Sequence, residues 1–179
     1  MGMTLPEFIA KLDTYADRVP LDELEAMLGA LDLSHGELEQ YYSFSHGHYT
    51  RNPIALGSAY QALVLCWLPG QESVIHDHKG SSCALRVLEG ECTEVAYDWQ
   101  PDGSLAEGGT CCLLEGRICG TQDADIHRIR NLTPGNLVTL HVYSPPLEIM
   151  NTYKPSGECI GECHVPAQAP NSPMLAGVR

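Results

Sequence analysis

From Tyr49 to Tyr153 the chain consists of short apolar runs separated by turn-forming residues, without helical periodicity between them. Runs of this kind predict strands, and the Gly- and Pro-containing breaks between them predict turns, here Pro101-Asp-Gly, Glu107-Gly-Gly, Thr133-Pro-Gly-Asn and Ser156-Gly. The expected strands are residues 49–56, 60–68, 73–78, 83–88, 91–98, 111–114, 126–132, 137–143 and 148–153. Many short strands without intervening helices predict a mainly β fold, an antiparallel sandwich or barrel.

The first 45 residues predict helices. Thr4 and Glu7 form a capping box in front of apolar residues at helical spacing, and Pro20 opens a second helical pattern. Ser34 and Glu37 repeat the capping pattern before a short third helix that carries Leu38, Tyr41 and Tyr42. A chain of 179 residues fits one domain. We expect a helical segment over 1–45, a β-barrel over 46–164 and an irregular tail over 165–179.

The charge of the chain limits its partners. The net charge is −13 with only 10 Lys and Arg residues, which argues against nucleic acid and anionic membranes as partners. No apolar run approaches the ~18 residues of a membrane span, and the first residues lack the basic start of a signal peptide. We therefore expect a cytoplasmic protein, a monomer or weak homo-oligomer.

Eight cysteines without a secretion signal indicate reduced thiols. Cys111-Cys112 and Cys159-x-x-x-Cys163-His164 could suggest a redox pair or a zinc knuckle, but no second ligand pair stands at zinc-finger spacing. We interpret them as reduced, partly buried thiols. His35, His46, His48 and His164 receive no role.

His76-Asp-His78 is the first pattern that carries chemistry. Side chains alternate along a strand, so both imidazoles reach one side while Asp77 points to the other, and one ion can bind both. With Gly70 before and Gly90 after it, the pair resembles the first signature of the cupin superfamily, whose β-barrels hold a metal. Cys83 stands where the cupin pattern usually carries a glutamate ligand.

The third donor is His127 or His141. His127 begins His127-Arg-Ile-Arg-Asn131, a partial match to the second cupin signature. We expect residues 126–132 and 137–143 to pair as a hairpin. A two-residue Pro134-Gly135 turn would place His127 and His141 on opposite faces. We favour a three-residue loop, which gathers His127, Thr139, His141 and Tyr143 on one face.

Several motifs in order resemble the cysteine dioxygenases, thiol-oxidising cupins. They are Tyr49-Thr-Arg51-Asn52, Leu65-Cys-Trp67, His76-Asp-His78 with Cys83, and Thr139-Leu-His141-Val-Tyr143-Ser-Pro-Pro146. The resemblance implies a jelly-roll-like cupin barrel and Fe(II) held by His76, His78 and His127. It also implies Arg51 and Tyr49 as carboxylate-binding residues, with Thr139, His141 and Tyr143 as a hydrogen-bonded relay at the oxygen site. A thioether between Cys83 and Tyr143 is a known feature of the family.

The expected reaction is the oxidation of L-cysteine by O2 to cysteine sulfinate. A related thiol carboxylate such as 3-mercaptopropionate is an alternative substrate, against which Arg51 argues because relatives with that preference carry Gln there. Three histidines also suit a zinc-bound hydroxide in a hydrolase, or a metal-binding module without enzymatic activity. Structurally, the histidines could be ordinary core residues, Arg51 a surface residue, and Tyr143 a packing residue at a barrel corner with a cis Ser144–Pro145 bond.

Overall fold

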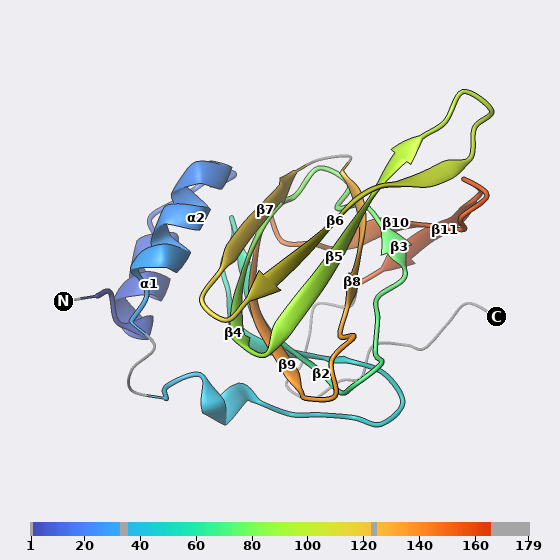
Figure 1. Cartoon of the computed structure of the whole chain (residues 1–179). Helices are drawn as coiled ribbons and strands as arrows, with labels where there is room; N and C mark the ends of the chain where they lie inside the picture. The colour runs from blue at the N-terminus through green and yellow to red at the C-terminus, as the bar shows by residue number, and fades with distance from the viewer. Residues whose placement is uncertain (1, 33–35, 123–124, 166–179) are drawn as a thin grey trace.

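Two antiparallel sheets lie face to face, and two helices cover the outside of one of them (Figure 1). The computed structural model describes residues 2–32, 36–122 and 125–165. The sheet beneath the helices, here called the helix-side sheet, has the strand order β1 (Thr50–Leu56), β2 (Gln61–Trp67), β9 (Leu137–Ser144), β4 (Ser82–Glu89) and β7 (Ile118–Gln122). The opposite sheet, here called the far sheet, has the order β11 (Cys159–His164), β10 (Ile149–Tyr153), β3 (Ile75–His76), β8 (Ile126–Arg130), β5 (Glu91–Trp99) and β6 (Leu105–Leu114).

The helix-side sheet is buried on both faces. Every residue of β2 and of β9 is buried, and successive side chains alternate between two cores. One core lies between this sheet and the helices and includes Phe8, Leu28 and Val64. The other lies between the two sheets and includes Leu65 and Ile129. Burial on both faces explains why these strands read as nearly continuous apolar runs.

The helices α1 (Leu5–Leu12) and α2 (Leu21–Ala30) follow the predicted pattern. The capping box between Thr4 and Glu7 is present. α2 packs on β4 and β7. Arg86 of β4 anchors the C-terminal end of α2 to the sheet. The Nη1 of Arg86 donates to the backbone carbonyls of Leu28 (2.6 Å) and Leu31 (2.9 Å), which have no partner within the helix.

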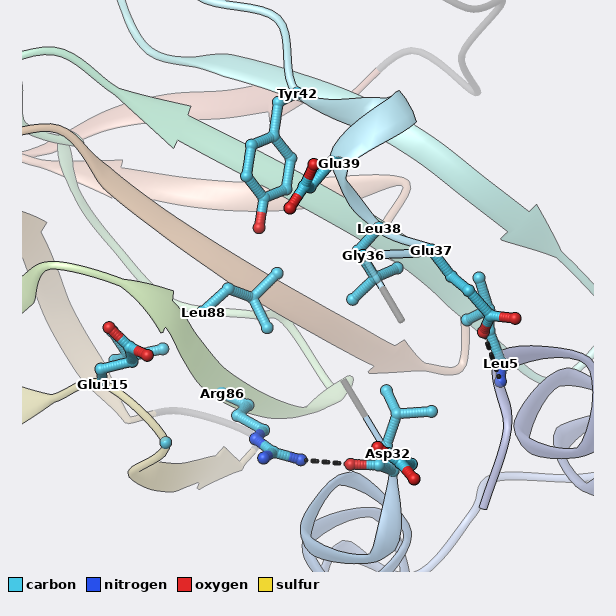
Figure 2. A pocket seen from close by; sticks show the side chains of 13 residues that line it. Leu5, Asp32, Gly36, Glu37, Leu38, Glu39, Tyr42, Arg86, Leu88 and Glu115 are labelled. Atoms are coloured by element: carbon cyan, nitrogen blue, oxygen red, sulfur yellow. Dashed lines mark hydrogen bonds between the residues drawn. The ribbon is translucent and has the colours of Figure 1, made fainter. Parts of the chain in front are cut away.

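A cavity of about 260 Å³ lies beside this contact (Figure 2). Its floor is apolar, with Leu5, Leu38 and Leu88, and Glu39 and Glu115 lie near its rim. The third predicted helix is shorter than expected, a single turn of 3₁₀-helix (Glu39–Tyr41), and its expected cap, Ser34, lies outside the described residues. Of the predicted tail over 165–179, Val165 is buried in the core between the sheets, and residues 166–179 lie outside the described residues.

The predicted strands are present, with two additions and one correction. β7 and β11 were not predicted, β6 begins earlier than expected, and of the strand predicted over 73–78 only the two residues Ile75–His76 form a strand. Glu107-Gly-Gly is not a turn, because Gly108 is an extra residue in the ladder between β5 and β6. A Cβ at Gly108 would lie 2.0 Å from an Asp98 carboxylate oxygen, so a larger residue there would require the Asp98 side chain to move. The Ser144–Pro145 bond is cis, as predicted.

The expected hairpin between residues 126–132 and 137–143 is wrong. β8 pairs with β3 and β5 in the far sheet, whereas β9 pairs with β2 and β4 in the helix-side sheet. The turn after Asn131 therefore carries the chain across from one sheet to the other. The two segments still face each other, but across the interior.

The mainly β, cupin-type fold is confirmed. The described strands form two separate sheets and not one hydrogen-bonded, closed barrel. Within the described residues, no helix has the length and apolar character needed to cross a membrane.

Candidate metal centre and substrate pocket

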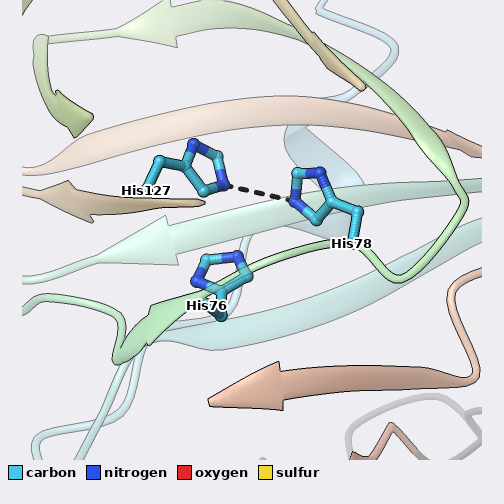
Figure 3. Close-up of side chains that lie close together, drawn as sticks. All are labelled: His76, His78 and His127. Carbon is cyan, nitrogen blue, oxygen red and sulfur yellow. Dashed lines mark hydrogen bonds between the residues drawn. The ribbon is translucent and has the colours of Figure 1, made fainter. Parts of the chain in front are cut away.

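Three histidines from the far sheet converge in the interior (Figure 3). His76 lies on β3 opposite His127 of β8, and His78 follows just after β3. All three are buried, and one ligand atom from each lies within 4.8 Å of the others. The Nε2 atoms of His78 and His127 are 3.2 Å apart. The structure thus brings together the three residues that the sequence singled out, and Asp77 faces away from them to Asn151 and Tyr153.

Each imidazole has a separate partner for its Nδ1 atom. The Nδ1 of His76 lies 2.9 Å from the carbonyl oxygen of Val74, and that of His78 lies 3.3 Å from the hydroxyl of Thr121. The Nδ1 of His127 lies 2.6 Å from a carboxylate oxygen of Glu94. A hydrogen bond at one ring nitrogen orients the ring and leaves the other nitrogen for a metal.

The donor set fits a divalent transition metal. Two imidazoles about 2.1 Å from one ion, with perpendicular bonds, have nitrogens roughly 3.0 Å apart, close to the 3.2 Å between His78 and His127. Burial, followed by the neighbouring His127, lowers the pKa of His76 to about 3 and that of His78 well below its ordinary value. Both rings are therefore neutral near pH 7, which is the form that binds metals.

Arg51 projects from β1 into the same interior. It is 3% exposed, and its Nε and Nη2 atoms are buried without a hydrogen-bond partner. Its guanidinium carbon lies 5.2 Å from the centre of the Tyr143 ring. Arg51, His76, His127 and Tyr143 line one small cavity together with Tyr49, which stacks on Trp67 at 4.0 Å. A buried cation with free donors is costly unless an anion binds it.

The residues expected to form a relay lie on β9. Thr139, His141 and Tyr143 are two residues apart and face the interior from the helix-side sheet. The Thr139 hydroxyl lies 3.0 Å from Nε2 of His141, and the Tyr143 hydroxyl lies 3.3 Å from Nδ1 of the same ring. Trp67 extends the chain, because its Nε1–H donates to the Thr139 hydroxyl at 3.1 Å. Burial raises the pKa of Tyr143, so its phenol stays protonated.

Cys83 lies next to this chain. In the ladder between β4 and β9 it is the register partner of Tyr143, and its Sγ lies 3.7 Å from Nδ1 of His141. Burial raises the pKa of the Cys83 thiol to about 12. The odd spacing from His78 is no obstacle, since Lys79 and Gly80 turn the chain with positive φ values of 42° and 94°. Cys83 therefore lies in β4 of the helix-side sheet.

Sequence reasoning missed Glu94 and Thr121, the partners of His127 and His78. Burial raises the pKa of Glu94, but the hydrogen bond to His127 and its charge outweigh this, so that the net pKa is lowered. A signal for Glu94 was present in the sequence, because Glu94 lies two residues after the buried Cys92 and therefore on the same face of the strand. A carboxylate at such a position needs a buried partner. Thr121 gave no comparable signal.

Comparison with known proteins identifies the family. The profile described as "Cysteine dioxygenase type I" matches residues 4–156. The chain belongs to the type I cysteine dioxygenase family. It is 32% identical over 143 residues to cysteine dioxygenase type 1 of Rattus norvegicus, covering 76% of this chain and 71% of the relative. It is 31% identical to the protein of that name from Homo sapiens over the same shares.

Two solved structures share the fold. The TT1209 protein of Thermus thermophilus has a TM-score of 0.54 at 20% identity and covers 62% of this chain and 95% of its own. A Klebsiella pneumoniae protein with a double-stranded β-helix domain has the same TM-score and identity, and it covers 69% of this chain and 99% of its own. The family assignment and the three-histidine site, together with this fold, identify the chain as a cupin-fold thiol dioxygenase.

Loss of any one of the three histidines should abolish tight metal binding. We expect His76→Ala, His78→Ala and His127→Ala each to lower the metal content of the purified protein to near zero, because two imidazoles remain. His164→Ala, at an exposed position, is the control and should keep its metal. Metal content is measured by elemental analysis. Full retention in the His127 variant would move the third ligand to His141.

Acidification should destabilise the metal-free protein through His76. Its folded pKa of about 3 lies below the 6.5 of the unfolded chain, so between these values only the unfolded state binds the proton. The contribution of neutral His76 to the free energy of unfolding is fully present above pH 6.5 and is lost as the pH falls toward 3. His76→Gln cannot be protonated, and its urea unfolding should depend less on pH between 6.5 and 4. Identical pH dependence in both proteins would contradict this.

Proposed function

We propose that this protein is a non-haem Fe(II) enzyme that oxidises L-cysteine with O2 to cysteine sulfinate. One observation carries the proposal: the buried, unpartnered nitrogens of Arg51 share a cavity with His76 and His127 of the three-histidine cluster. A substrate that fills this cavity needs an anion at one end and a metal-binding group at the other. A thiol amino acid has both, in line with the family to which the chain belongs.

Arg51 would bind the substrate carboxylate. Its planar guanidinium can donate two parallel, charge-assisted hydrogen bonds, and the two free nitrogens are those that lack partners. Tyr49, held by its stacking on Trp67, forms the adjacent wall. Since Arg51 is fixed on β1 and the histidines on the far sheet, the carboxylate contact orients the thiol toward the histidine cluster.

The all-histidine set suits a thiolate substrate. Fe(II) on His76, His78 and His127 would supply a Lewis acid that binds the deprotonated thiol and a redox centre for O2. Among the described residues, the cluster contains no acidic ligand. Three neutral imidazoles leave the full charge of the ion available to an incoming anion. Both oxygen atoms of O2 enter the sulfinate, and the sulfur is oxidised by four electrons.

Thr139, His141 and Tyr143 would control the proton at the reacting end. The phenol of Tyr143 is neutral and can donate a hydrogen bond to an oxygen atom in the cavity, while His141 orients its hydroxyl. Trp67 and Thr139 in turn hold His141 from behind. These hydrogen-bonded side chains are all buried, which excludes water from their hydrogen bonds.

A panel of substrates tests the proposal. Oxygen consumption is measured with cysteine, 3-mercaptopropionate and cysteamine, together with elemental analysis of protein purified without added metal and mass spectrometry of the product. Bound iron and cysteine sulfinate are the expected results. Preference for 3-mercaptopropionate would change the substrate, and bound zinc without oxygen consumption would favour the hydrolytic alternative.

Removing Arg51 should weaken cysteine binding. We expect Arg51→Ala to raise KM for cysteine about 10- to 150-fold, because charge-assisted hydrogen bonds contribute ~1.5–3 kcal/mol. Cysteamine lacks the carboxylate and should be a poor substrate of the unmodified protein. Arg117→Ala, at an exposed position, is the control and should leave KM unchanged. Equal turnover of cysteine and cysteamine would contradict the role of Arg51.

A thioether between Cys83 and Tyr143 is the second part of the proposal. The two residues are register partners on β4 and β9, and both side chains are buried in the interior. The link joins Sγ to a ring carbon, with loss of one hydrogen from each residue, a two-electron oxidation for which O2 is the oxidant. It would hold the phenol in place beside the cavity.

The thioether should accumulate with turnover. Mass spectrometry after many turnovers with cysteine and O2 should show a protein lighter by two hydrogen atoms and a fused peptide that contains Cys83 and Tyr143. The activity of Cys83→Ser should fall while the variant keeps its iron. Cys92→Ser, at another buried cysteine, is the control and should still form the link. Separate, unmodified peptides throughout would refute the link and leave the dioxygenase proposal standing.

A further inference from the structure

His127 differs from the other two histidines in the charge of its partner. His76 bonds to a backbone carbonyl and His78 to a hydroxyl, both neutral groups. The partner of His127 is the carboxylate of Glu94, at 2.6 Å. The side chains of the pair are only 4% and 9% exposed. This hydrogen bond is therefore charge-assisted and shielded from water, which makes it the strongest of the three.

Glu94 is held from both sides of the interior. It projects from β5 of the far sheet, and its second oxygen accepts a hydrogen bond from the Cys119 thiol of β7 at 3.0 Å. β7 belongs to the helix-side sheet. The carboxylate thus bridges the two sheets, and neither oxygen is free to turn toward the histidine cluster. A buried carboxylate is costly, and an apolar side chain in its place would cost the fold less.

The charges around the cavity explain why a buried carboxylate at Glu94 is useful despite its energetic cost. Arg51 is cationic, a bound iron adds two positive charges, and the imidazoles of the cluster are the only ligands that the described residues supply. Cys83 stands at the position from which cupins usually supply a carboxylate, and its thiol is neutral. Glu94 places a negative charge one imidazole away from the metal position, where it cannot compete with a substrate thiolate for the ion.

We propose that Glu94 is a positioning residue that fixes His127 toward the iron and supplies the negative charge that stabilises the ion, the oxidised form above all. This inference rests on the proposed function, because it requires iron on the three histidines. An anion near the metal favours Fe(III) over Fe(II), so it lowers the reduction potential. Cys119 holds the carboxylate in this orientation.

E94Q separates charge from shape, since glutamine keeps an acceptor oxygen of the same reach but is neutral. Fe(II) affinity is measured anaerobically by competition with a chelator, and the Fe(III)/Fe(II) midpoint potential by redox titration. We expect about 10- to 100-fold weaker binding and a raised potential. E107Q, on exposed Glu107 of the neighbouring strand β6, is the matched control and should change neither. Circular dichroism of the metal-free variants tests whether they are folded.

E94D keeps the charge but shortens the side chain by one methylene. It should bind Fe(II) more weakly, while its potential stays closer to that of the unmodified protein than the potential of E94Q does. Unchanged affinity or unchanged potential in E94Q overturns the inference while the iron site stands. If E94Q does not fold, E94D decides: unchanged affinity overturns the inference, and weaker binding supports it. An unmodified protein that binds no iron overturns the proposed function as well.

Discussion

The position of β9 between two cores is the constraint on which the rest of the site depends. All eight of its residues, from Leu137 to Ser144, are buried. Val138, Leu140 and Val142 pack against the helices, while the alternate residues Thr139, His141 and Tyr143 face the other sheet. A slip of one residue would exchange the two sets and bury polar side chains against the helices. Apolar packing on the outside therefore holds Thr139, His141 and Tyr143 in register on the inside.

Many polar groups of the interior are satisfied by one another. Trp67, Thr139, His141 and Tyr143 form one connected chain, and each histidine of the cluster has a partner at Nδ1. Arg51, by contrast, has two buried nitrogens that lack a hydrogen-bond partner. In such a site an unpaired cation gains more from a bound anion than it would in water. The carboxylate binding proposed for Arg51 follows from this imbalance.

Burial also sets the protonation states that the chemistry needs. It keeps His76 neutral and the thiol of Cys83 and the phenol of Tyr143 protonated near pH 7. The neutral thiol of Cys83 does not compete with a substrate thiolate. The fixed charges of the pocket are thus the guanidinium of Arg51 on one side and the carboxylate of Glu94 behind His127 on another. This distribution of charges fits the thiol-oxidising family to which the chain belongs.

Local patterns were enough to predict the two α-helices, most strands and the His76–His78 pair, whereas the family resemblance selected His127 over His141 as the third residue of the cluster. The Thr4 capping box and the alternation in His76-Asp-His78 depend on near neighbours, so they can be read along the chain. The hairpin between 126–132 and 137–143 was wrong, because the turn at Pro134 does not show whether the chain pairs beside itself or crosses to the other sheet. Pairing of β9 with β2 and β4 decides that, and these partners are distant in sequence. The same holds for the contact between Glu94 and His127, which depends on the pairing of β5 with β8. It also holds for the unpaired nitrogens of Arg51, which share a cavity with the histidines only when the two sheets close over one interior.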